Sequence, residues 1–597
     1  MQEASSSLSI THGPSEPALI PFSIGQLLDH QAAKYPTHEA VVFPTEGIRY
    51  TYHELSHRVQ TVSKALLAHG ISAGDRIGVF SGNCAQYVEV FLAVTRIGAI
   101  TVLLNTAYSS IECQNVLKET AGCSMLFTSS HIGQRGLASN IGDIRLLMEK
   151  NKLPDLKEIV LLQSHGPPSE YRLYEDFLNQ ASRRPEIGLS EEVDSDQTCT
   201  FQFTSGTTGA PKIAMLTHRN VINNGNLIGH RLQLTPEDVV CCPYPLFHIF
   251  GLVIGLLSCL THGATVVYPS PTFDPAAVLQ SIVQESCTGL HGVPTIFIAL
   301  LERYHHLNLD SIHIRTGLIG GAPIPAALIK DVQRAFGFED LTVAYGTTET
   351  SPISFMSRAS DQPDDGVVIH NALLPHTSAK IVDLEGKVVP RGVRGELCIA
   401  GYLVQEGYHE NPTKTAEALR PDASGIVWMH SGDEALVNED GHCLITGRIK
   451  DIIIRGAENI YPAEIEERLN EHPAISQACV VGVQHRLLGE EVAAILQPAL
   501  DQPRPSRQTI IDWVQTTLGT QKAPSWIFWL GDDGNPKAFP ITESGKIKRI
   551  EVADLSNQLL AKKMPSGYMG PSGLMDPTTR PPWTTEPEKR NKFCLLS

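Results

Sequence analysis

Short apolar segments alternate with amphipathic segments from about residue 22 to residue 131. Residues 52–69 have apolar side chains at helical spacing and are followed by Gly70, which predicts an amphipathic helix that ends at this glycine. Residues 76–80 form a short apolar run, which predicts a buried strand, and residues 85–98 predict the next helix. Strands separated by helices are typical of parallel sheets, so this part of the chain is predicted to have an α/β fold.

The same alternation recurs between Thr198 and Tyr345, and the pattern then changes. Apolar strands are predicted at residues 198–203, 239–243, 264–268, 316–320 and 341–345. Between residues 366 and 446, short strands are interrupted by glycine and proline, which predicts an antiparallel barrel or sheet. After Gly447, a smaller unit of mixed strands and helices is expected to end near Leu560.

These patterns predict an α/β protein with a large N-terminal lobe and a small C-terminal domain. The lobe is expected to contain parallel-type α/β subdomains and a small barrel-like sheet, and the small domain is expected to be α+β. Both terminal segments are polar and lack a periodic apolar face, which predicts disorder. The expected boundaries are 1–20 for a disordered N-terminus, 21–447 for the large domain, 448–560 for the small domain and 561–597 for a disordered proline-rich tail.

The composition of the 597-residue chain limits the classes of protein that fit it. Hydrophobic residues make up 42% and charged residues 19%, so most of the chain can bury a core. The formal net charge of −17 disfavours a nucleic-acid binder, because such proteins are expected to be basic. The 12 cysteines include no CxxC pair and no cluster at zinc spacing, which favours reduced thiols in an intracellular compartment.

The location of the protein is predicted from two further features of the sequence. The N-terminus has no apolar signal core. The longest apolar stretch, residues 249–260, is shorter than the roughly 20 residues that a membrane helix needs. We therefore expect a cytoplasmic protein that neither enters the secretory route nor spans a membrane.

The strongest chemical signal directly follows the predicted strand 198–203. It comprises two glycines, four hydroxyl residues and a lysine: Thr204, Ser205, Gly206, Thr207, Thr208, Gly209 and, after Ala210 and Pro211, Lys212. Backbone N–H groups and hydroxyls of such a loop can donate to phosphate oxygens, while Lys212 adds a positive charge. Because Pro211 precedes the lysine, the GxxxxGK[ST] spacing of a Walker A loop is absent. A surface turn rich in serine and threonine is the structural alternative.

A second group of polar residues follows the predicted strand 341–345. It consists of Tyr345, Gly346, Thr347, Thr348 and Glu349. The aromatic ring can stack on a base, the hydroxyls can bind phosphate, and the carboxylate can bind a hard cation such as Mg²⁺. A glycine turn with a helix-capping threonine and glutamate is the structural alternative.

Two later segments add further polar groups. Asp433 follows a glycine turn, where a carboxylate can accept hydrogen bonds from both hydroxyls of a ribose. Arg448 offers a fork-shaped donor for ribose or phosphate. Lys546 lies on a glycine-containing turn and is followed by more basic residues; taken alone, such a lysine is usually a solvated surface charge.

Taken together, these motifs resemble those of the adenylate-forming superfamily, which comprises acyl-CoA synthetases, luciferases and peptide-synthetase adenylation domains. The resemblance covers about residues 22–555. It implies that 21–447 and 448–560 are the large and small AMP-binding domains, and that the small domain is mobile. The implied nucleotide-site residues are the phosphate loop 204–212, an adenine-side segment of Gly320, Gly321, Ala322 and Pro323, the adenine and magnesium motif 345–349, the ribose-binding pair Asp433 and Arg448, and the catalytic Lys546.

The resemblance also implies roles for residues near the start of the small domain. Lys450 matches the interdomain hinge. Gly456 and Ala457 match the loop beside the tunnel for the CoA thiol. The family usually has a second glycine where this chain has Ala457, and we expect this departure to narrow the tunnel.

The reaction that the resemblance implies has two steps. A carboxylate attacks the α-phosphate of ATP, which yields an acyl-adenylate and pyrophosphate; a thiol then attacks the adenylate and releases AMP. Lys546, together with Mg²⁺ held by Glu349, is implied to stabilise charge at the α-phosphate. The implied cofactors are ATP, Mg²⁺ and CoA, with the phosphopantetheine arm of a carrier protein as the alternative to CoA.

The class of acid is predicted from residues 245–252. In peptide-synthetase adenylation domains, the matching segment usually holds the substrate α-ammonium with an aspartate, and this chain has no acidic residue there. An uncharged tail is therefore favoured over an amino acid, because apolar walls cannot pair an ammonium group. His248 matches the family's gate residue near the carboxylate and is a candidate catalytic residue, with a satisfied core histidine as the alternative.

These residues are compared with three possible functions, which they favour to different degrees. The whole chain most resembles fungal acyl-CoA ligases of secondary metabolism and siderophore pathways, so the main hypothesis is a ligase that joins a fatty or short branched acid to CoA. The near alternative is an acyl-AMP ligase that loads the carrier domain of a synthetase. A catalytically inactive nucleotide-binding scaffold is disfavoured, because the motif residues Glu349, Asp433, Arg448 and Lys546 are all present.

The last four residues, Cys594-Leu595-Leu596-Ser597, fit the C-a-a-X pattern, and a terminal serine points to farnesylation of Cys594. A small basic cluster precedes them. One prenyl chain of this kind gives reversible membrane binding, so we expect peripheral association with membranes if Cys594 is modified. A chance match in a disordered tail is the alternative. The sequence offers no Ser-Lys-Leu ending, so peroxisomal import by that route is not supported.

Overall fold

In the computed structural model, most of the chain is described. The described residues are 8–120, 122–163, 171–181, 192–204, 212–304, 312–322, 324, 326–357, 372–439, 442–455, 458–485, 488–499, 502–532, 534–542 and 546–563. Cys594 and nearly all of the predicted tail lie outside these residues, so the lipidation of Cys594 stays a prediction.

The chain divides into two compact units. The first consists of Met1–Val393, Leu397–Ser431 and Val437–Leu444, and the second of Arg394–Glu396, Gly432–Leu436 and Ile445–Ser597. The second unit thus begins close to the predicted boundary at residue 448. It also takes in two short pieces of chain that the sequence patterns place in the large domain.

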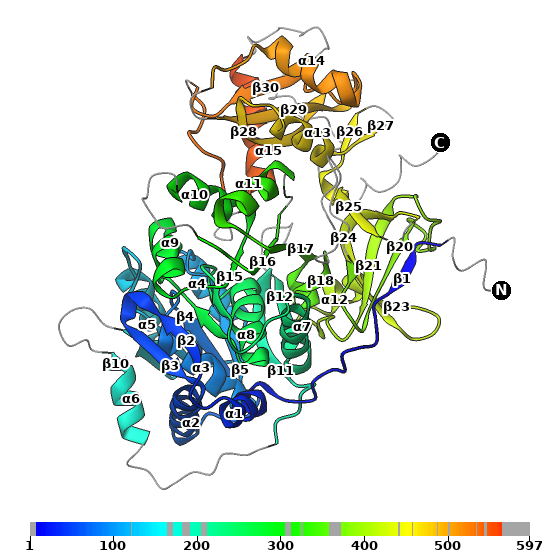
Figure 1. Cartoon of the computed structure of the whole chain (residues 1–597). Helices are drawn as coiled ribbons and strands as arrows, with labels where there is room; N and C mark the ends of the chain where they lie inside the picture. The colour runs from blue at the N-terminus through cyan, green and yellow to red at the C-terminus, as the bar shows by residue number, and fades with distance from the viewer. Residues whose placement is uncertain are drawn as a thin grey trace. The chain divides into compact units, whose positions relative to one another are not determined.

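The first unit contains an eight-stranded sheet with the order β10-β9-β6-β4-β5-β11-β12-β22. Its strands β4, β5, β10, β11 and β12 are labelled in Figure 1. From β10 to β11 the neighbouring strands are parallel, and β12 and β22 continue the sheet antiparallel. The strands are β4 (Arg76–Phe80), β5 (Ile100–Leu103), β6 (Cys123–Thr128), β9 (Glu158–Leu161), β10 (Arg172–Leu173), β11 (Thr198–Thr204), β12 (Lys212–Thr217) and β22 (Gly407–Tyr408). A separate two-stranded ribbon pairs β7 (His131–Ile132) with β8 (Arg135–Gly136).

A nine-stranded sheet of the same unit has the order β19-β18-β17-β16-β15-β13-β14-β2-β3. Its central strands from β17 to β2 are parallel, whereas β18, β19 and β3 pair antiparallel at the two edges. The strands are β2 (Glu39–Phe43), β3 (Ile48–Thr51), β13 (Val239–Cys241), β14 (Thr265–Val267), β15 (Gly289–Gly292), β16 (Thr316–Gly320), β17 (Asp340–Gly346), β18 (Ile353–Met356) and β19 (Ala372–Leu373). The predicted α/β fold with parallel sheets is therefore confirmed.

The helices predicted at residues 52–69 and 85–98 are present as α2 (Tyr52–Ala68) and α3 (Ala85–Arg96). In α2, Thr51 and Glu54 form a capping box at the start, and Leu55, Val59 and Val62 form one buried stripe. The helices are α1 (Ile24–Lys34), α2 (Tyr52–Ala68), α3 (Ala85–Arg96), α4 (Ser110–Glu119), α5 (Ala138–Glu149), α6 (Tyr174–Ala181), α7 (His218–Arg231), α8 (Ser258–His262), α9 (Pro275–Gln284), α10 (Pro294–Tyr304), α11 (Ala326–Phe336) and α12 (Pro412–Ala418), with short helices η1 (Pro44–Glu46), η2 (Phe250–Leu257) and η3 (Thr348–Thr350).

Most of the longest apolar run, residues 249–260, forms the π-helix η2, whose residues are all buried, and the end of the run belongs to α8. Within the described part of the chain, no helix has the length and apolar character needed to cross a membrane. The 11 described cysteines are all buried and form no disulfide with one another.

A six-stranded sheet has the order β1-β20-β21-β24-β23, with β25 also paired to β24. The strands are β1 (Ile10–His12), β20 (Thr377–Val382), β21 (Gly395–Gly401), β23 (Leu419–Pro421), β24 (Val427–Val437) and β25 (Cys443–Arg448). The prediction that residues 1–20 are disordered is wrong for residues 8–20, because β1 pairs antiparallel with β20, from Ile10 opposite Lys380 to His12 opposite Ser378. Backbone hydrogen bonds to a distant strand order this polar segment.

The second unit contains a small α/β sandwich. Its sheet has the order β27-β26-β29-β28, with β30 beside β29. Along β28, Ala478 and Val480 pack with α13 and α14, whereas Cys479 and Val481 pack with α15 on the other face, as strand alternation requires. The elements are η4 (Ile449–Asp451), β26 (Ile453–Arg455), β27 (Glu458–Ile460), α13 (Pro462–Asn470), β28 (Ile475–His485), β29 (Gly489–Pro498), α14 (Arg507–Leu518), β30 (Trp526–Trp529) and α15 (Arg549–Lys563).

Candidate active site

The predicted phosphate loop joins two antiparallel strands. Thr204 is the last residue of β11 and Lys212 the first of β12, and the two residues stand opposite each other in the sheet. The hydroxyl of Thr204 is buried without a hydrogen-bond partner among the described residues. The rest of the loop, Ser205, Gly206, Thr207, Thr208 and Gly209, lies outside the described residues. The structure thus places both ends of the loop side by side at the end of a strand.

The adenine-side segment and the second motif leave the sheet from neighbouring strands. Gly320 ends β16 opposite Ala344 of the parallel strand β17. A Cβ atom at Gly320 would lie 2.7 Å from the carbonyl oxygen of Ala344, so only glycine fits there. Gly321 and Ala322 follow directly, and Pro323 lies outside the described residues. This register brings the segment beside Tyr345, the residue after Ala344, as expected for a shared site.

The second motif turns sharply after β17. A Cβ atom at Gly346 would come within 1.8 Å of the Pro352 carbonyl oxygen, so the close backbone approach requires glycine. Thr347 then leads into η3, and its N–H donates to Thr350 Oγ1 (3.1 Å). Thr348 and Glu349 form the first two positions of η3, which begins two residues after the end of β17.

Lys212 and Glu349 are brought together through a third residue, Tyr408. The Lys212 ammonium donates to the Tyr408 hydroxyl (Nζ to Oη, 2.7 Å), and this hydroxyl donates to Glu349 Oε1 (2.8 Å). Burial raises the pKa of Tyr408, and the charge of Glu349 raises it further. Tyr408 is not among the residues predicted from the sequence, because its Gly-Tyr segment lies between the motifs recognised there.

The predicted ribose pair lies within the second unit. Gly432 has a φ of +72°, a backbone conformation that favours glycine, and it places Asp433 at the turn. The Arg448 guanidinium at the end of β25 lies 3.4 Å from Asp433 (Nε to Oδ1). Asp433 is buried and Arg448 exposed, so the carboxylate is held in place while the guanidinium reaches solvent. The structure therefore brings together the two residues that the sequence predicts to bind ribose.

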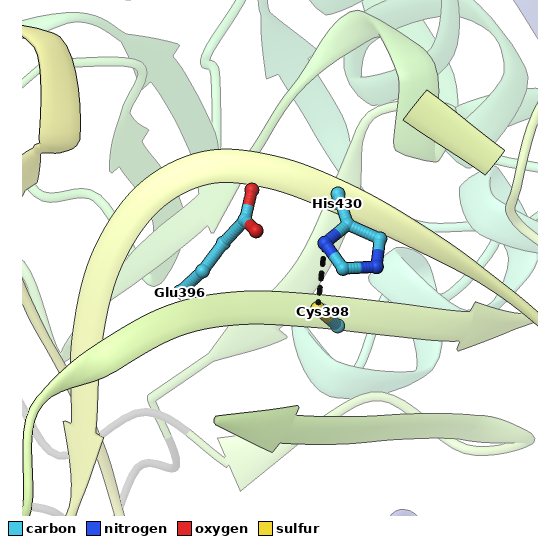
Figure 2. A group of neighbouring side chains, drawn as sticks. All are labelled: Glu396, Cys398 and His430. Carbon is cyan, nitrogen blue, oxygen red and sulfur yellow. Dashed lines mark hydrogen bonds between the residues drawn. The ribbon is translucent and has the colours of Figure 1, made fainter. Parts of the chain in front are cut away.

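Three side chains of metal-binding type, Glu396, Cys398 and His430, are shown in Figure 2. His430 Nδ1 and Cys398 Sγ are hydrogen-bonded at 3.4 Å. Glu396 Oε1 accepts a hydrogen bond from the Gly432 N–H (3.1 Å), which holds the turn before Asp433. These hydrogen bonds give the three residues structural roles, and Glu396 is a supporting residue that sequence reasoning missed.

The predicted catalytic lysine lies on a loop whose two ends are hydrogen-bonded to each other. The Thr542 N–H donates to the carbonyl oxygen of Lys546 (2.7 Å), and the Lys546 N–H donates to Thr542 Oγ1 (3.0 Å). Residues 543–545 at the tip lie outside the described residues. Helix α15 begins three residues after Lys546, at Arg549, which ties the loop to the body of the small domain.

Arg549 anchors this loop through a pair of hydrogen bonds to Glu466 of α13 (Nη1 to Oε1, 2.7 Å; Nη2 to Oε2, 2.6 Å). Burial alone would lower the pKa of Arg549, but the charge of Glu466 more than offsets this, and the pKa is raised. Glu466→Ala should destabilise the small domain by about 2 kcal/mol, because it removes both carboxylate hydrogen bonds of a guanidinium that is 27% exposed and leaves it only Asp451 at 3.6 Å and the Val480 carbonyl oxygen. Hydrogen exchange of the amides in α13 and β28, followed by mass spectrometry, measures this loss.

The matched control for this prediction is Glu551→Ala. Its carboxylate pairs with Lys548 at 2.8 Å, but the side chain is 53% exposed. An exposed pair of this kind contributes about 0.5 kcal/mol or less, so the control should leave the exchange rates nearly unchanged. Equal protection of the α13 amides in Glu466→Ala and wild type would contradict the anchoring role of Arg549.

The remaining predicted residues fall in two segments. Lys450 lies in the short helix η4, and the tunnel residues Gly456 and Ala457 lie outside the described residues.

His248 lies just before η2, where its Nδ1 accepts a hydrogen bond from the Phe250 N–H (3.1 Å), so the neutral ring carries its proton on Nε2. Around it, Leu246, Phe247 and Phe250 are buried, and the segment is apolar as predicted.

Two family models match this chain. The model described as AMP-binding enzyme matches residues 28–409, and that described as AMP-binding enzyme C-terminal domain matches residues 464–546. The chain therefore belongs to the AMP-binding enzyme family, which confirms the resemblance to adenylate-forming enzymes seen in its motifs.

Relatives narrow this class further. The acyl-CoA ligase sidI of Beauveria bassiana is 46% identical over 562 residues, which cover 94% of this chain and 96% of the relative. The acyl-CoA ligase sidI of Aspergillus fumigatus is 44% identical, over 93% and 95% of the two chains. This protein is an AMP-forming acyl-CoA ligase, which forms an acyl-adenylate from ATP and a carboxylic acid and transfers the acyl group to CoA.

Solved structures share the same fold. ATP-bound MatB from Rhodopseudomonas palustris is 25% identical, with a TM-score of 0.76 over 90% of this chain and 100% of that chain. The anthranilate CoA ligase AuaEII in complex with anthranoyl-AMP gives a TM-score of 0.79 over 91% of this chain and 99% of that chain, at 24% identity. At this identity, the second likeness concerns the fold alone.

Proposed function

We propose that this ligase activates an aliphatic carboxylic acid, either a fatty acid or a short branched acid. The observation that carries the proposal is the apolar segment 245–252, which has no acidic residue and whose side chains Leu246, Phe247 and Phe250 are buried. A substrate ammonium would find no partner there, and burying an unpaired charge is costly. An uncharged hydrocarbon tail meets no such penalty.

The residues present account for the chemistry of the first step. The carboxylate oxygen of the acid bonds to the α-phosphorus of ATP, and pyrophosphate leaves with the electron pair of the broken P–O bond. Lys546 stabilises the charge that develops at the α-phosphate, while the loop 204–212 holds the leaving phosphates. Asp433 and Arg448 fix the ribose, and His248 borders the carboxylate.

Glu349 is proposed to hold Mg²⁺, which adds positive charge beside the phosphates when it is bound. The side chain fits this role, because carboxylate oxygens are ligands that Mg²⁺ prefers. Tyr408 donates to Oε1 of Glu349, and among the described residues Oε2 accepts no hydrogen bond. One carboxylate oxygen is thus available to a cation, while the hydrogen bond to the other oxygen fixes the orientation of the Glu349 side chain.

A matched pair of acids tests the proposed substrate class, because 4-methylpentanoic acid and leucine differ only by the α-amino group. We expect ATP–pyrophosphate exchange with 4-methylpentanoic acid to exceed that with leucine at least about 100-fold, since the ammonium would be buried unpaired. Straight-chain fatty acids of increasing length then define how deep the pocket is. Exchange with leucine and none with aliphatic acids would refute the proposal.

We propose CoA as the acceptor in vivo, with the phosphopantetheine arm of a synthetase carrier domain as the alternative. The resemblance to fungal ligases of secondary metabolism supports a role in that metabolism. AMP release from a preformed acyl-adenylate should be faster with free CoA than with a pantetheinylated carrier domain at equal concentration. The reverse order would favour the carrier-loading alternative.

A further inference from the structure

Tyr408 lies between the two charged side chains of the first unit that are assigned to the triphosphate. Its hydroxyl accepts from Lys212 at 2.7 Å and donates to Glu349 at 2.8 Å. The Lys212 ammonium also stands over the Tyr408 ring, 4.1 Å from its centroid, which adds a cation–π interaction. Lys212 Nζ and Glu349 Oε1 form a loose ion pair at 3.9 Å, which is beyond hydrogen-bond distance, and the hydroxyl bridges the two groups.

The backbone around Tyr408 is tied to both motifs. Strand β22 pairs with β12, so Tyr408 stands opposite Ala214, and the His409 N–H donates to the Ile213 carbonyl oxygen (2.9 Å). On the other side, the Gln405 N–H donates to the carbonyl oxygen of Glu349 (3.0 Å). The segment 405–409 therefore spans from the Glu349 motif to the strand that begins with Lys212, and it presents the hydroxyl at a fixed position between them.

Charge attraction explains why a spacer is needed at this point. The Lys212 and Glu349 side chains are only 29% and 16% exposed, so water screens their attraction weakly. Without the hydroxyl, the ammonium and the carboxylate could approach from 3.9 Å to hydrogen-bond distance and form a tighter ion pair. MgATP would then have to break that pair before either group could bind a phosphate or a cation.

We propose that Tyr408 is a positioning residue that keeps Lys212 and Glu349 apart and aimed at the triphosphate and its cation. The proposal rests on the proposed roles of Lys212 and Glu349 in binding MgATP, and it does not depend on which acid is activated. It extends the nucleotide site by one residue from a segment outside the family motifs recognised in the sequence.

The test is the full-length Tyr408→Phe variant, which keeps the aromatic ring and removes only the hydroxyl. We expect the KM for MgATP and the Mg²⁺ concentration for half-maximal pyrophosphate exchange to rise about tenfold or more, the scale of one hydrogen bond to a charged group. The KM values for the acid and for CoA should stay within about twofold of wild type, which is within ordinary mutational scatter. Thioester formation from a supplied acyl-adenylate should also be unchanged, because it uses no triphosphate.

The matched control is Tyr402→Phe. Tyr402 is half-buried and its hydroxyl accepts a hydrogen bond from Asn224 Nδ2 (3.1 Å), but neither Lys212 nor Glu349 is hydrogen-bonded to it in the described structure. This variant measures the general cost of losing a tyrosine hydroxyl, and its KM for MgATP should equal that of wild type. Replacing Tyr408 by p-aminophenylalanine restores a donor at the same position and should recover part of the Mg²⁺ dependence.

Two outcomes would overturn the proposal: an unchanged MgATP dependence in Tyr408→Phe, or an equal loss for MgATP, acid and CoA, which indicates a purely structural role. Calorimetric titration of MgATP, without any acid, measures the same effect directly. Melting temperatures of both variants show whether the fold is intact. If the wild-type protein binds MgATP but activates no aliphatic acid, the proposed substrate class is refuted. The titration of MgATP still tests the role of Tyr408 in that case.

Discussion

Lys546→Ala should lower the rate of acyl-adenylate formation by ~10²–10³, the usual cost of removing a group that stabilises charge mainly in the transition state. The loop that carries Lys546 is held at its base by two hydrogen bonds to Thr542, so the substitution removes the ammonium without removing the loop. Pyrophosphate exchange measures the adenylation step. Thioester formation from a supplied acyl-adenylate measures the second step and should be largely unaffected.

Lys548→Ala provides the matched control, because this lysine lies two residues further along and is 43% exposed in its pair with Glu551. It should retain both half-reactions, which separates the specific role of Lys546 from a general loss of positive charge. An equal loss of both half-reactions in Lys546→Ala would contradict the assignment of Lys546 to the adenylation step alone.

Local sequence patterns predicted the interior of the sheets well. The run Arg76–Phe80 is apolar because parallel strands are covered on both faces, and it forms β4 with the predicted bounds. In the second unit, the run around Val480 alternates between two cores, and the strand β28 that contains it spans Ile475–His485. Whether a segment forms a helix or a strand follows from the periodicity of its apolar residues, whereas the first and last residues of a strand depend on its pairing with neighbouring strands.

The features that the sequence did not reveal depend on contacts between distant segments. Ile10–His12 form a strand only because β20 offers its edge, and the polar composition of the N-terminus gives no sign of this partner. Tyr408 gains its position by meeting Lys212 and Glu349, which belong to separate motifs. Motif recognition could therefore name the candidate residues of the nucleotide site but not the residue that lies between two of them.

Lys450→Pro should leave one half-reaction nearly intact and strongly slow the other. Lys450 is the second residue of η4, and Arg448, the residue before this helix, has an extended backbone. Gly447 precedes Arg448 and has a φ of +150°. Proline holds φ near −65° and restricts the residue before it, so it removes the backbone freedom that a hinge uses. We propose that the two half-reactions need different backbone conformations at this position, as multi-step enzymes with mobile domains often do.

The control Lys450→Ala removes the side chain but keeps the backbone free, and both half-reactions should run at near wild-type rates. The comparison therefore assigns any defect of the proline variant to the backbone and not to the lost ammonium. Pyrophosphate exchange and thioester formation from a supplied acyl-adenylate report the two steps separately. If the proline variant performs both steps as fast as the alanine variant, the hinge lies elsewhere, and Gly447, the nearby residue with a positive φ, becomes the next position to restrict.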